Sequence, residues 1–121
     1  MVISFNKIFK EPILAGTKVH TIREDPKCRW QKGKHIHFAT GVRTSKYNCF
    51  KEGTCQGIRH IEIEPSTHSI YLTYGMERRM LSKKGKEELI KNDGFKHSGA
   101  FWEWFKKPFT GRIIWWVEPQ Y

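Results

Sequence analysis

The last part of the chain contains the feature that most restricts its fold, an almost uninterrupted apolar run within residues 111–118. The residues of this run are Ile113, Ile114, Trp115, Trp116 and Val117. A strand with one face in water alternates apolar and polar residues, whereas a strand covered on both faces does not need to. We therefore expect residues 111–118 to form a strand between the interior of a β-barrel and a packed helix.

Further strands are predicted wherever apolar and polar residues alternate. Segments 35–40, 55–64 and 67–74 have this pattern, and Pro65-Ser66 fits a hairpin connection between the last two. A short strand is expected at 2–5, and another at 47–50 within a basic, polar loop that spans 41–52. With the final strand included, the pattern predicts about six strands.

Three segments have helical features instead. Ser82 can cap a helix that begins at Lys83 and runs to about residue 92. Ser98 can cap a second helix, rich in aromatic residues, that ends before Pro108. Residues 7–15 should form one or two helical turns that end at Gly16. Together these elements predict an α+β fold, a small and mostly antiparallel β-barrel with helices covering it.

Length, charge and cysteine content limit the class of protein. At 121 residues the chain is long enough for one core, so we take residues 1–121 as a single domain. The formal net charge of +10 favours anionic partners, with nucleic acid first, although a merely soluble basic protein can have the same composition. The three cysteines lack C-x-x-C spacing, so neither a zinc site nor a disulfide framework is expected. No signal peptide or membrane span is recognisable, which predicts a cytoplasmic protein without a membrane partner.

Polar residues are crowded into the segment 18–24, between an apolar run and a turn. If the segment is a strand, one face carries Lys18, His20 and Ile22, and the other carries Val19, Thr21 and Arg23. Neither face can be buried unless its polar groups find partners, because an unpaired buried polar group costs a few kcal/mol. The segment therefore lines either a wet pocket or groove, or it forms a solvated edge strand.

The same segment, extended upstream to Ile13, resembles the signature of the ASCH domain family, which belongs to the PUA-like superfamily. The family pattern is an apolar pair, a small residue and a glycine, followed by Lys-Thr-x-Thr-Ile-Arg. Residues 13–23 have the sequence Ile-Leu-Ala-Gly-Thr-Lys-Val-His-Thr-Ile-Arg, with Val19 in place of the first Thr. Two further blocks resemble the family: Trp30 followed by Gly33 and an alternating strand, and residues 93–95 (Asp-Gly-Phe) followed by the aromatic segment 101–105.

This resemblance implies a PUA-like β-barrel with a cleft at the signature segment, and a role in RNA or nucleotide metabolism. Small bacterial members of the family include an amidohydrolase that removes the acetyl group of N4-acetylcytidine, with a Lys, a Thr and a Glu as catalytic residues. Lys18 and Thr21 fall on the first two of these positions. Asp93 aligns best with the third and is one methylene shorter than Glu, while Glu88 and Glu77 are the other candidates. No cofactor is implied.

The residues themselves leave the role of the segment open. Thr21 can act as a nucleophile if a buried Lys18 takes its proton, and Asp93 can orient that lysine. Equally, Lys18 and Arg23 can pair with Glu24 or Asp93 and simply tie the barrel to its helices. Lys18 and Thr21 are three positions apart, so they converge only if the chain bends between them.

Two other functions use the same cleft, a non-catalytic RNA-binding module and a ribonuclease. Side chains that can contact RNA or a nucleoside by stacking or charge are His20, Arg23, Trp30, Arg43, Lys46 and Tyr47. Trp30 can instead be a core residue. We expect no metal, because His35 and His37 share one strand face but have no third ligand in evident register.

Overall fold

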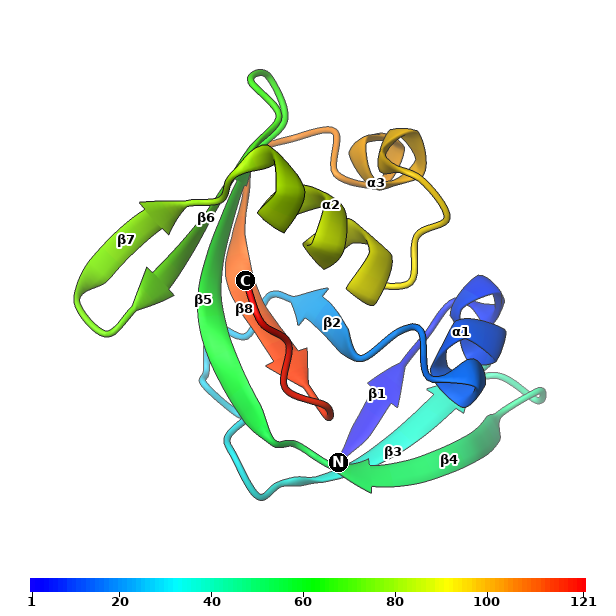
Figure 1. Ribbon diagram of the computed structural model, residues 1–121. Coiled ribbons are helices and arrows are strands. Elements are labelled where there is room, and N and C mark those ends of the chain that lie inside the picture. The colour runs from blue at the N-terminus through cyan, green and yellow to red at the C-terminus, as the bar shows by residue number, and fades with distance from the viewer.

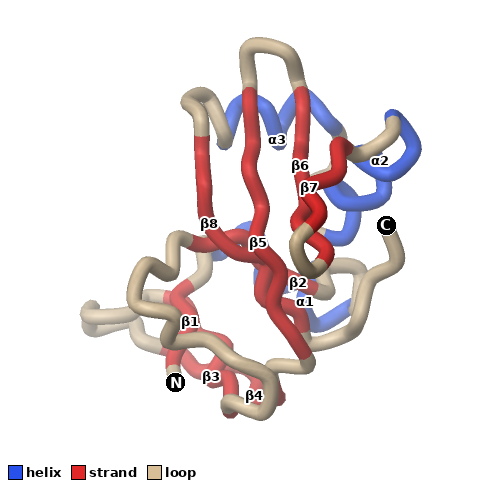
Figure 2. Tube along the Cα trace, turned by 90° about the vertical axis from the view of Figure 1, so that its left-hand side faces the viewer, coloured by secondary structure: helices blue, strands red, loops and turns tan.

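Eight strands and three α-helices make up the fold, which a computed structural model describes for residues 1–121 (Figure 1). The smaller sheet has the strand order β1 (Val2–Ser4), β3 (His35–Thr40) and β4 (Asn48–Thr54). The larger sheet has the order β2 (His20–Arg23), β8 (Phe109–Trp115), β5 (Gly57–Glu64), β6 (Ser69–Tyr74) and β7 (Glu77–Met80). The α+β class predicted from the sequence is confirmed. The strands nevertheless hydrogen-bond as two sheets and not as one closed barrel (Figure 2).

The strands that the sequence pattern missed or shortened lie at sheet edges. All four residues of β7 are exposed, and β4 has no buried residue, although it extends well beyond the predicted segment 47–50. An edge strand without a buried face carries no apolar periodicity, so no alternation marks it in the sequence. These edges account for most of the difference between about six predicted strands and the eight observed.

Strand β8 lies in the middle of the larger sheet, between β2 and β5, and is antiparallel to both. Ile113 and Ile114 point to opposite faces of β8, and both are almost fully buried. The prediction of a strand covered on both faces is therefore confirmed. Pairing ends at Trp115, after which the backbone amide of Trp116 donates to the carbonyl of Val19 at 3.1 Å.

The helices begin and end close to where their capping residues predict. A 3₁₀ turn (Lys7–Phe9) leads into α1 (Lys10–Ala15), which ends at Gly16 with a left-handed φ of 82°. In α2 (Lys83–Asn92) the hydroxyl of Ser82 accepts a hydrogen bond from the amide of Gly85, as expected. The prediction for α3 (Ser98–Trp104) was wrong by one residue, because the extended His97 is the N-cap and its imidazole accepts from the amide of Ala100.

Both sheets and the helices contribute to one core of 23 buried residues. The ring of Phe38, from the smaller sheet, packs edge-on against Trp116 at 4.8 Å. Helices α2 and α3 lie on one side of the larger sheet and bury Leu89, Ile90 and Phe101 against it (Figures 1 and 2). None of the helices has both the length and the apolar character needed to cross a bilayer.

Candidate functional site

The polar segment 18–24 is held between α1, the end of α2 and strand β8. The amides of Thr17 and Lys18 donate to the carbonyl of Pro12, and the amide of Val19 donates to the carbonyl of Asn92 at 2.8 Å. From His20 onward the chain is strand β2, paired with β8. Strand β2 is an edge strand, but it is not solvated, because His20 and Thr21 are almost fully buried.

One face of this segment lines a pocket of about 270 Å³, which lies near the lower limit of small-molecule sites. Lys18, Thr21 and Arg23 contribute polar atoms from the segment, and Asp93 contributes them from the end of α2. Much of the remaining lining is aromatic, from Phe9, Phe95, Trp104, Phe105 and Phe109, and it is completed by Ser4, Asn6, Ile22 and Glu24. The pocket therefore combines an apolar wall with a few convergent polar groups, the composition that ligand sites favour.

Lys18 is the most unusual residue of the pocket, since only 1% of its surface is exposed. Its Nζ donates to the backbone carbonyl of Asp93 at 2.5 Å and to Oδ1 of the same residue at 3.3 Å. The ammonium also lies 4.5 Å from the centre of the Phe9 ring. Burial lowers the pKa of Lys18, while the negative charge of Asp93 opposes that shift without cancelling it.

The glycine that follows Asp93 is required by the path of the Lys18 side chain. Gly94 has a left-handed φ of 93°, and a Cβ at this position would lie 2.9 Å from Cδ of Lys18. A larger residue at position 94 would therefore have to displace the lysine or the end of α2. The Asp93-Gly94 pair thus serves the site twice, because Asp93 binds the ammonium and Gly94 leaves room for the aliphatic chain.

On the other side of Asp93, His20 is fully buried and lies outside the pocket. Its Nδ1 is 3.0 Å from Oδ1 of Asp93, and its Nε2 is 2.5 Å from the hydroxyl of Tyr121. The Tyr121 hydroxyl also accepts a hydrogen bond from the side-chain Nδ2 of Asn92 at 3.0 Å. A consistent assignment has Nδ1–H donating to Asp93 and the Tyr121 hydroxyl donating to Nε2. Burial lowers the pKa of His20, which favours this neutral form.

Arg23 and Thr21 line the pocket next to each other. The Nε of Arg23 donates to Oγ1 of Thr21 at 3.1 Å, and its Nη2 donates to the carbonyl of Ser4 at 2.5 Å. Arg23 makes no ion pair, so the expected pairing with Glu24 or Asp93 is wrong for Arg23, while the Lys18–Asp93 pair is confirmed. Burial lowers the pKa of Arg23. The Thr21 hydroxyl accepts the hydrogen bond from Arg23, and its own hydrogen has no acceptor within the chain.

Lys18 and Thr21 line the same pocket although they are three positions apart. On a regular strand their side chains would point to opposite faces. Strand β2 begins only at His20, so Lys18 precedes the strand and is not bound by its alternation. The backbone hydrogen bond from Val19 to Asn92 holds the chain at the point where Lys18 leads into this strand.

Several residues predicted to contact a ligand lie elsewhere. His20 has both ring nitrogens occupied inside the protein, so it offers no face to a base, and that prediction was wrong. Trp30 belongs to the core with 8% of its surface exposed, so its packing alternative is the correct one. Three further candidates are exposed in the β3–β4 loop, away from the pocket lining: Arg43, Lys46 and Tyr47.

Among the acidic candidates, only Asp93 reaches Lys18. Glu77 is exposed on β7 and pairs with Arg79, and Glu88 is exposed on α2. Neither of these glutamates lines the pocket. Glu24, Asn92 and Tyr121 were not among the predicted site residues. Glu24 lines the pocket, and its position in the crowded polar segment could have predicted this. No local sequence pattern predicts that Tyr121 lies next to His20.

No family model matches the chain, and neither the curated proteins nor the solved structures contain a significant match. The resemblance to the ASCH family stays a prediction from the motif residues.

Proposed function

We propose that the Lys18 pocket binds an acylated nucleoside and hydrolyses its amide bond, with N4-acetylcytidine as the substrate implied by the resemblance to the ASCH family. The observation that carries this proposal is the burial of Lys18 beside Asp93, in a pocket that also holds the hydroxyl of Thr21. Amide hydrolysis needs a nucleophile, a base with an adjusted pKa and a donor for the oxyanion. As part of the same proposal, the two sheets correspond to the β-barrel of the PUA-like superfamily.

The aromatic wall supplies the contact for the base. Phe9, Phe95 and Trp104 pack edge-on against one another and line the pocket together. A flat nucleobase gains most from stacking on such side chains, at about 1–3 kcal/mol per base. The polar groups of Lys18, Thr21 and Arg23 then face the exocyclic substituent.

The proposed reaction starts from Lys18 that has lost its proton, the form that burial favours by lowering the pKa of Lys18. Oγ1 of Thr21 attacks the acetyl carbonyl carbon and transfers its proton to this amine. Arg23, which already donates to Oγ1, stabilises the negative charge that develops on the carbonyl oxygen. The carbon–nitrogen bond breaks, the leaving nitrogen takes the proton from Lys18, and cytidine departs. Water then hydrolyses the acetyl ester on Thr21, which releases acetate and restores the hydroxyl. Asp93 touches no substrate atom and acts as a positioning residue for Lys18.

The test is to incubate the protein with N4-acetylcytidine and to measure cytidine and acetate. Thr21→Val and Lys18→Met remove the nucleophile and the base with little change of volume, and each should lower kcat about 10²–10⁴-fold. Thr17→Val is the matched control, because Thr17 is an exposed threonine outside the pocket. Thermal unfolding of each variant separates a chemical loss from a folding defect. Absence of turnover in the wild type, or turnover that survives both pocket substitutions, would rule out the hydrolase.

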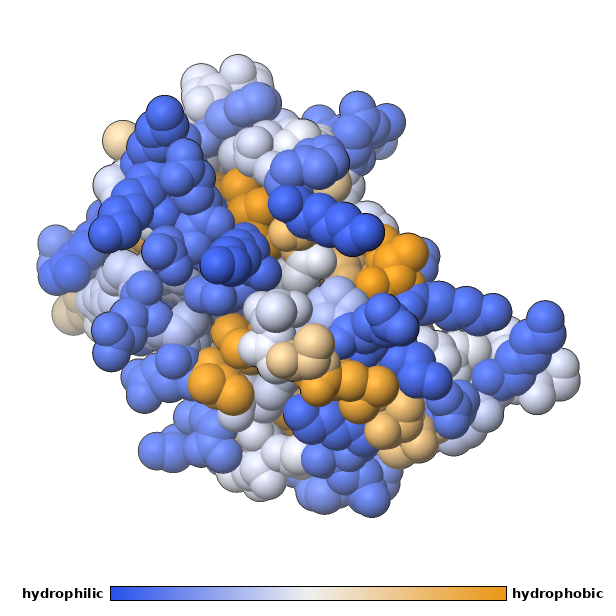
Figure 3. Space-filling model, turned by 45° about the vertical axis from the view of Figure 1, so that its right-hand side comes forward, coloured by the Kyte–Doolittle hydropathy of each residue, from blue (hydrophilic) through white to orange (hydrophobic).

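A second candidate is a non-catalytic RNA-binding module, which two observations favour. The net charge is +10, and the ammonium of Lys18 already donates to Asp93 and is thus less available for chemistry. Hydrophilic residues cover most of the face in Figure 3, with hydrophobic side chains reaching the surface in separate areas. RNA affinity should then fall steeply with salt, because each phosphate contact releases counterions. A ribonuclease is the third alternative. Mixtures of the protein and RNA, run on a denaturing gel, would reveal it by the appearance of RNA fragments.

A further inference from the structure

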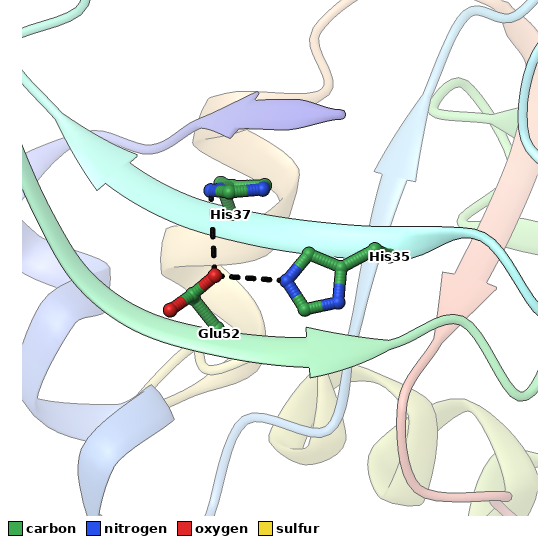
Figure 4. Close-up of side chains that lie close together, drawn as sticks. All are labelled: His35, His37 and Glu52. Carbon is green, nitrogen blue, oxygen red and sulfur yellow. Dashed lines mark hydrogen bonds and ion pairs between the residues drawn. The ribbon is translucent and has the colours of Figure 1, made fainter.

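A second cluster of titratable side chains lies on the smaller sheet. His35 and His37 are two positions apart on β3, so their side chains emerge from the same face of the sheet. Glu52 lies directly opposite His37 on the antiparallel strand β4. Figure 4 shows the three side chains turned toward one another across the two strands. Strand pairing therefore supplies the third group that the sequence pattern of His35 and His37 left undefined.

The spacing of the donor atoms suits a small metal ion. Nε2 of His35 is 2.9 Å from Oε1 of Glu52, and Nδ1 of His37 is 3.7 Å from the same oxygen. One ligand atom from each of the three residues can be chosen so that all lie within 4.8 Å of one another. Ligands bound tetrahedrally at about 2.0–2.1 Å stand roughly 3.3 Å apart. The two distances to Glu52 lie on both sides of that value, and the third separation is at most 4.8 Å, so rotation of these exposed side chains would bring the three atoms around one ion.

We propose that His35, His37 and Glu52 form a binding site for a divalent transition metal of the zinc class, with water completing the coordination. Two imidazoles and one carboxylate are a ligand set that suits zinc and its neighbours, while Mg²⁺ and Ca²⁺ prefer oxygen ligands. This proposal revises the expectation, based on sequence, that no metal binds.

The site is separate from the Lys18 pocket and open to solvent. None of its three residues lines that pocket. The side chains of His35, His37 and Glu52 are 52%, 40% and 60% exposed, so a hydrated ion can reach all three from solvent. Because three protein ligands leave at least one coordination position for water, the arrangement is that of an exchangeable site and not of a closed structural one.

The experiment is a calorimetric titration of Zn²⁺ into the full chain after removal of metals by chelation. We expect one tight site per chain, and no comparable binding of Mg²⁺. His37→Ala and Glu52→Ala each remove a ligand and should weaken zinc binding by at least about 10–100-fold, since even the loss of an outer-shell partner has that effect. His60→Ala is the matched control, because His60 is an exposed histidine on the other sheet, and it should leave the affinity unchanged.

Exposed thiols are the main competitors for zinc, so Cys28→Ser and Cys49→Ser belong to the same series. If either serine variant abolishes binding while His37→Ala does not, the assignment is overturned, as it is if the wild type binds no zinc. Titration with Co²⁺ followed by proton NMR gives a second measurement on the unaltered chain. The ring protons of His35 and His37 should shift or broaden at lower cobalt than those of His60, and the reverse order would contradict the site.

Discussion

Two clusters in this protein each place a carboxylate beside a histidine, and they differ in burial. In the Lys18 pocket, Asp93 bonds to a lysine and a histidine that are 1% and 0% exposed. On the β3–β4 sheet, Glu52 is hydrogen-bonded to His35 and lies 3.7 Å from Nδ1 of His37, with all three side chains 40% exposed or more. The buried cluster has its polar atoms satisfied within the chain, whereas the exposed cluster keeps donor atoms that face water.

Burial therefore determines what a carboxylate and a histidine can do together. In the buried cluster, desolvation lowers the pKa values of Lys18 and His20 and holds the groups as a fixed network. In the exposed cluster, solvent screens the charges, so the pairs contribute little to stability. The side chains of the exposed cluster can therefore replace their contacts with water by contacts with a metal ion.

The contrast is sharpest for removal of the two carboxylates. Asp93→Ala leaves the ammonium of Lys18 buried with only a backbone carbonyl as partner, and should lower the free energy of unfolding by about 3 kcal/mol. Glu52→Ala removes an exposed carboxylate that is hydrogen-bonded to His35, and should leave the denaturation midpoint almost unchanged. Urea unfolding followed by circular dichroism measures both. Equal losses in the two variants would show that burial is not what distinguishes the clusters.

A smaller effect isolates the packing of the Lys18 side chain. Gly94 and Gly33 have nearly the same backbone, with φ of 93° and 96°, but a Cβ at Gly33 meets nothing within 4 Å. Alanine at either position costs about 1 kcal/mol for the left-handed backbone. Gly94→Ala should cost about 1–2 kcal/mol more because its Cβ would press against the lysine stem. Denaturant unfolding compares the two variants, and equal costs would mean that the lysine moves aside freely.

The two clusters also differ in how far the sequence predicts them. The crowded polar segment and the Asp93-Gly94 pair mark the buried pocket, because burying Lys18, Thr21 and Asp93 leaves a recognisable conflict with apolar periodicity. The elements that hold the pocket were also predicted well, since Ser82, Gly16 and the run at Ile113 carry clear local signals.

The exposed cluster depends instead on strand register, which no local pattern encodes here. Glu52 reaches His37 only because β4 pairs with β3 through a loop and past a register shift between Phe38 and Ala39. Tyr121 was missed for a related reason. Its contact with His20 spans 101 positions and depends on the path of the chain after β8. Long-range partners of this kind are set by tertiary packing and not by propensity or periodicity.

A third prediction tests whether the Tyr121 hydroxyl belongs to the buried network. Tyr121→Phe removes the donor to Nε2 of His20 and leaves a buried acceptor without a partner, which should cost about 1.5 kcal/mol of stability. Tyr47→Phe is the control, because Tyr47 is exposed and its hydroxyl has no partner within the chain. Thermal unfolding measures the cost. Ring-nitrogen NMR of His20 should also change in Tyr121→Phe, and an unchanged spectrum would remove Tyr121 from the network.

The smallest effect is the dependence of stability on pH. The two clusters differ in the pH range over which their contribution to the free energy of unfolding is lost. The pKa of His20 lies below its ordinary value of 6.5 in the folded protein, so the unfolded chain takes up the proton first as the pH falls. The stability that the neutral His20 provides is fully present above about pH 6.5 and is lost below it, at no more than about 1.4 kcal/mol per pH unit. The pKa of Glu52 is also lowered, from 4.5, so its small contribution is lost only below that pH.

Urea unfolding between pH 7.5 and 5.5 measures this slope in the wild type and in His20→Gln, which cannot titrate. The wild type should lose stability over this range and the variant should lose less, while Glu52→Gln should follow the wild type because its carboxylate titrates at lower pH. If His20→Gln keeps the full wild-type slope, then the imidazole is not held neutral by burial. The buried cluster would then differ from the exposed one only in packing, and not in the charge that its groups carry.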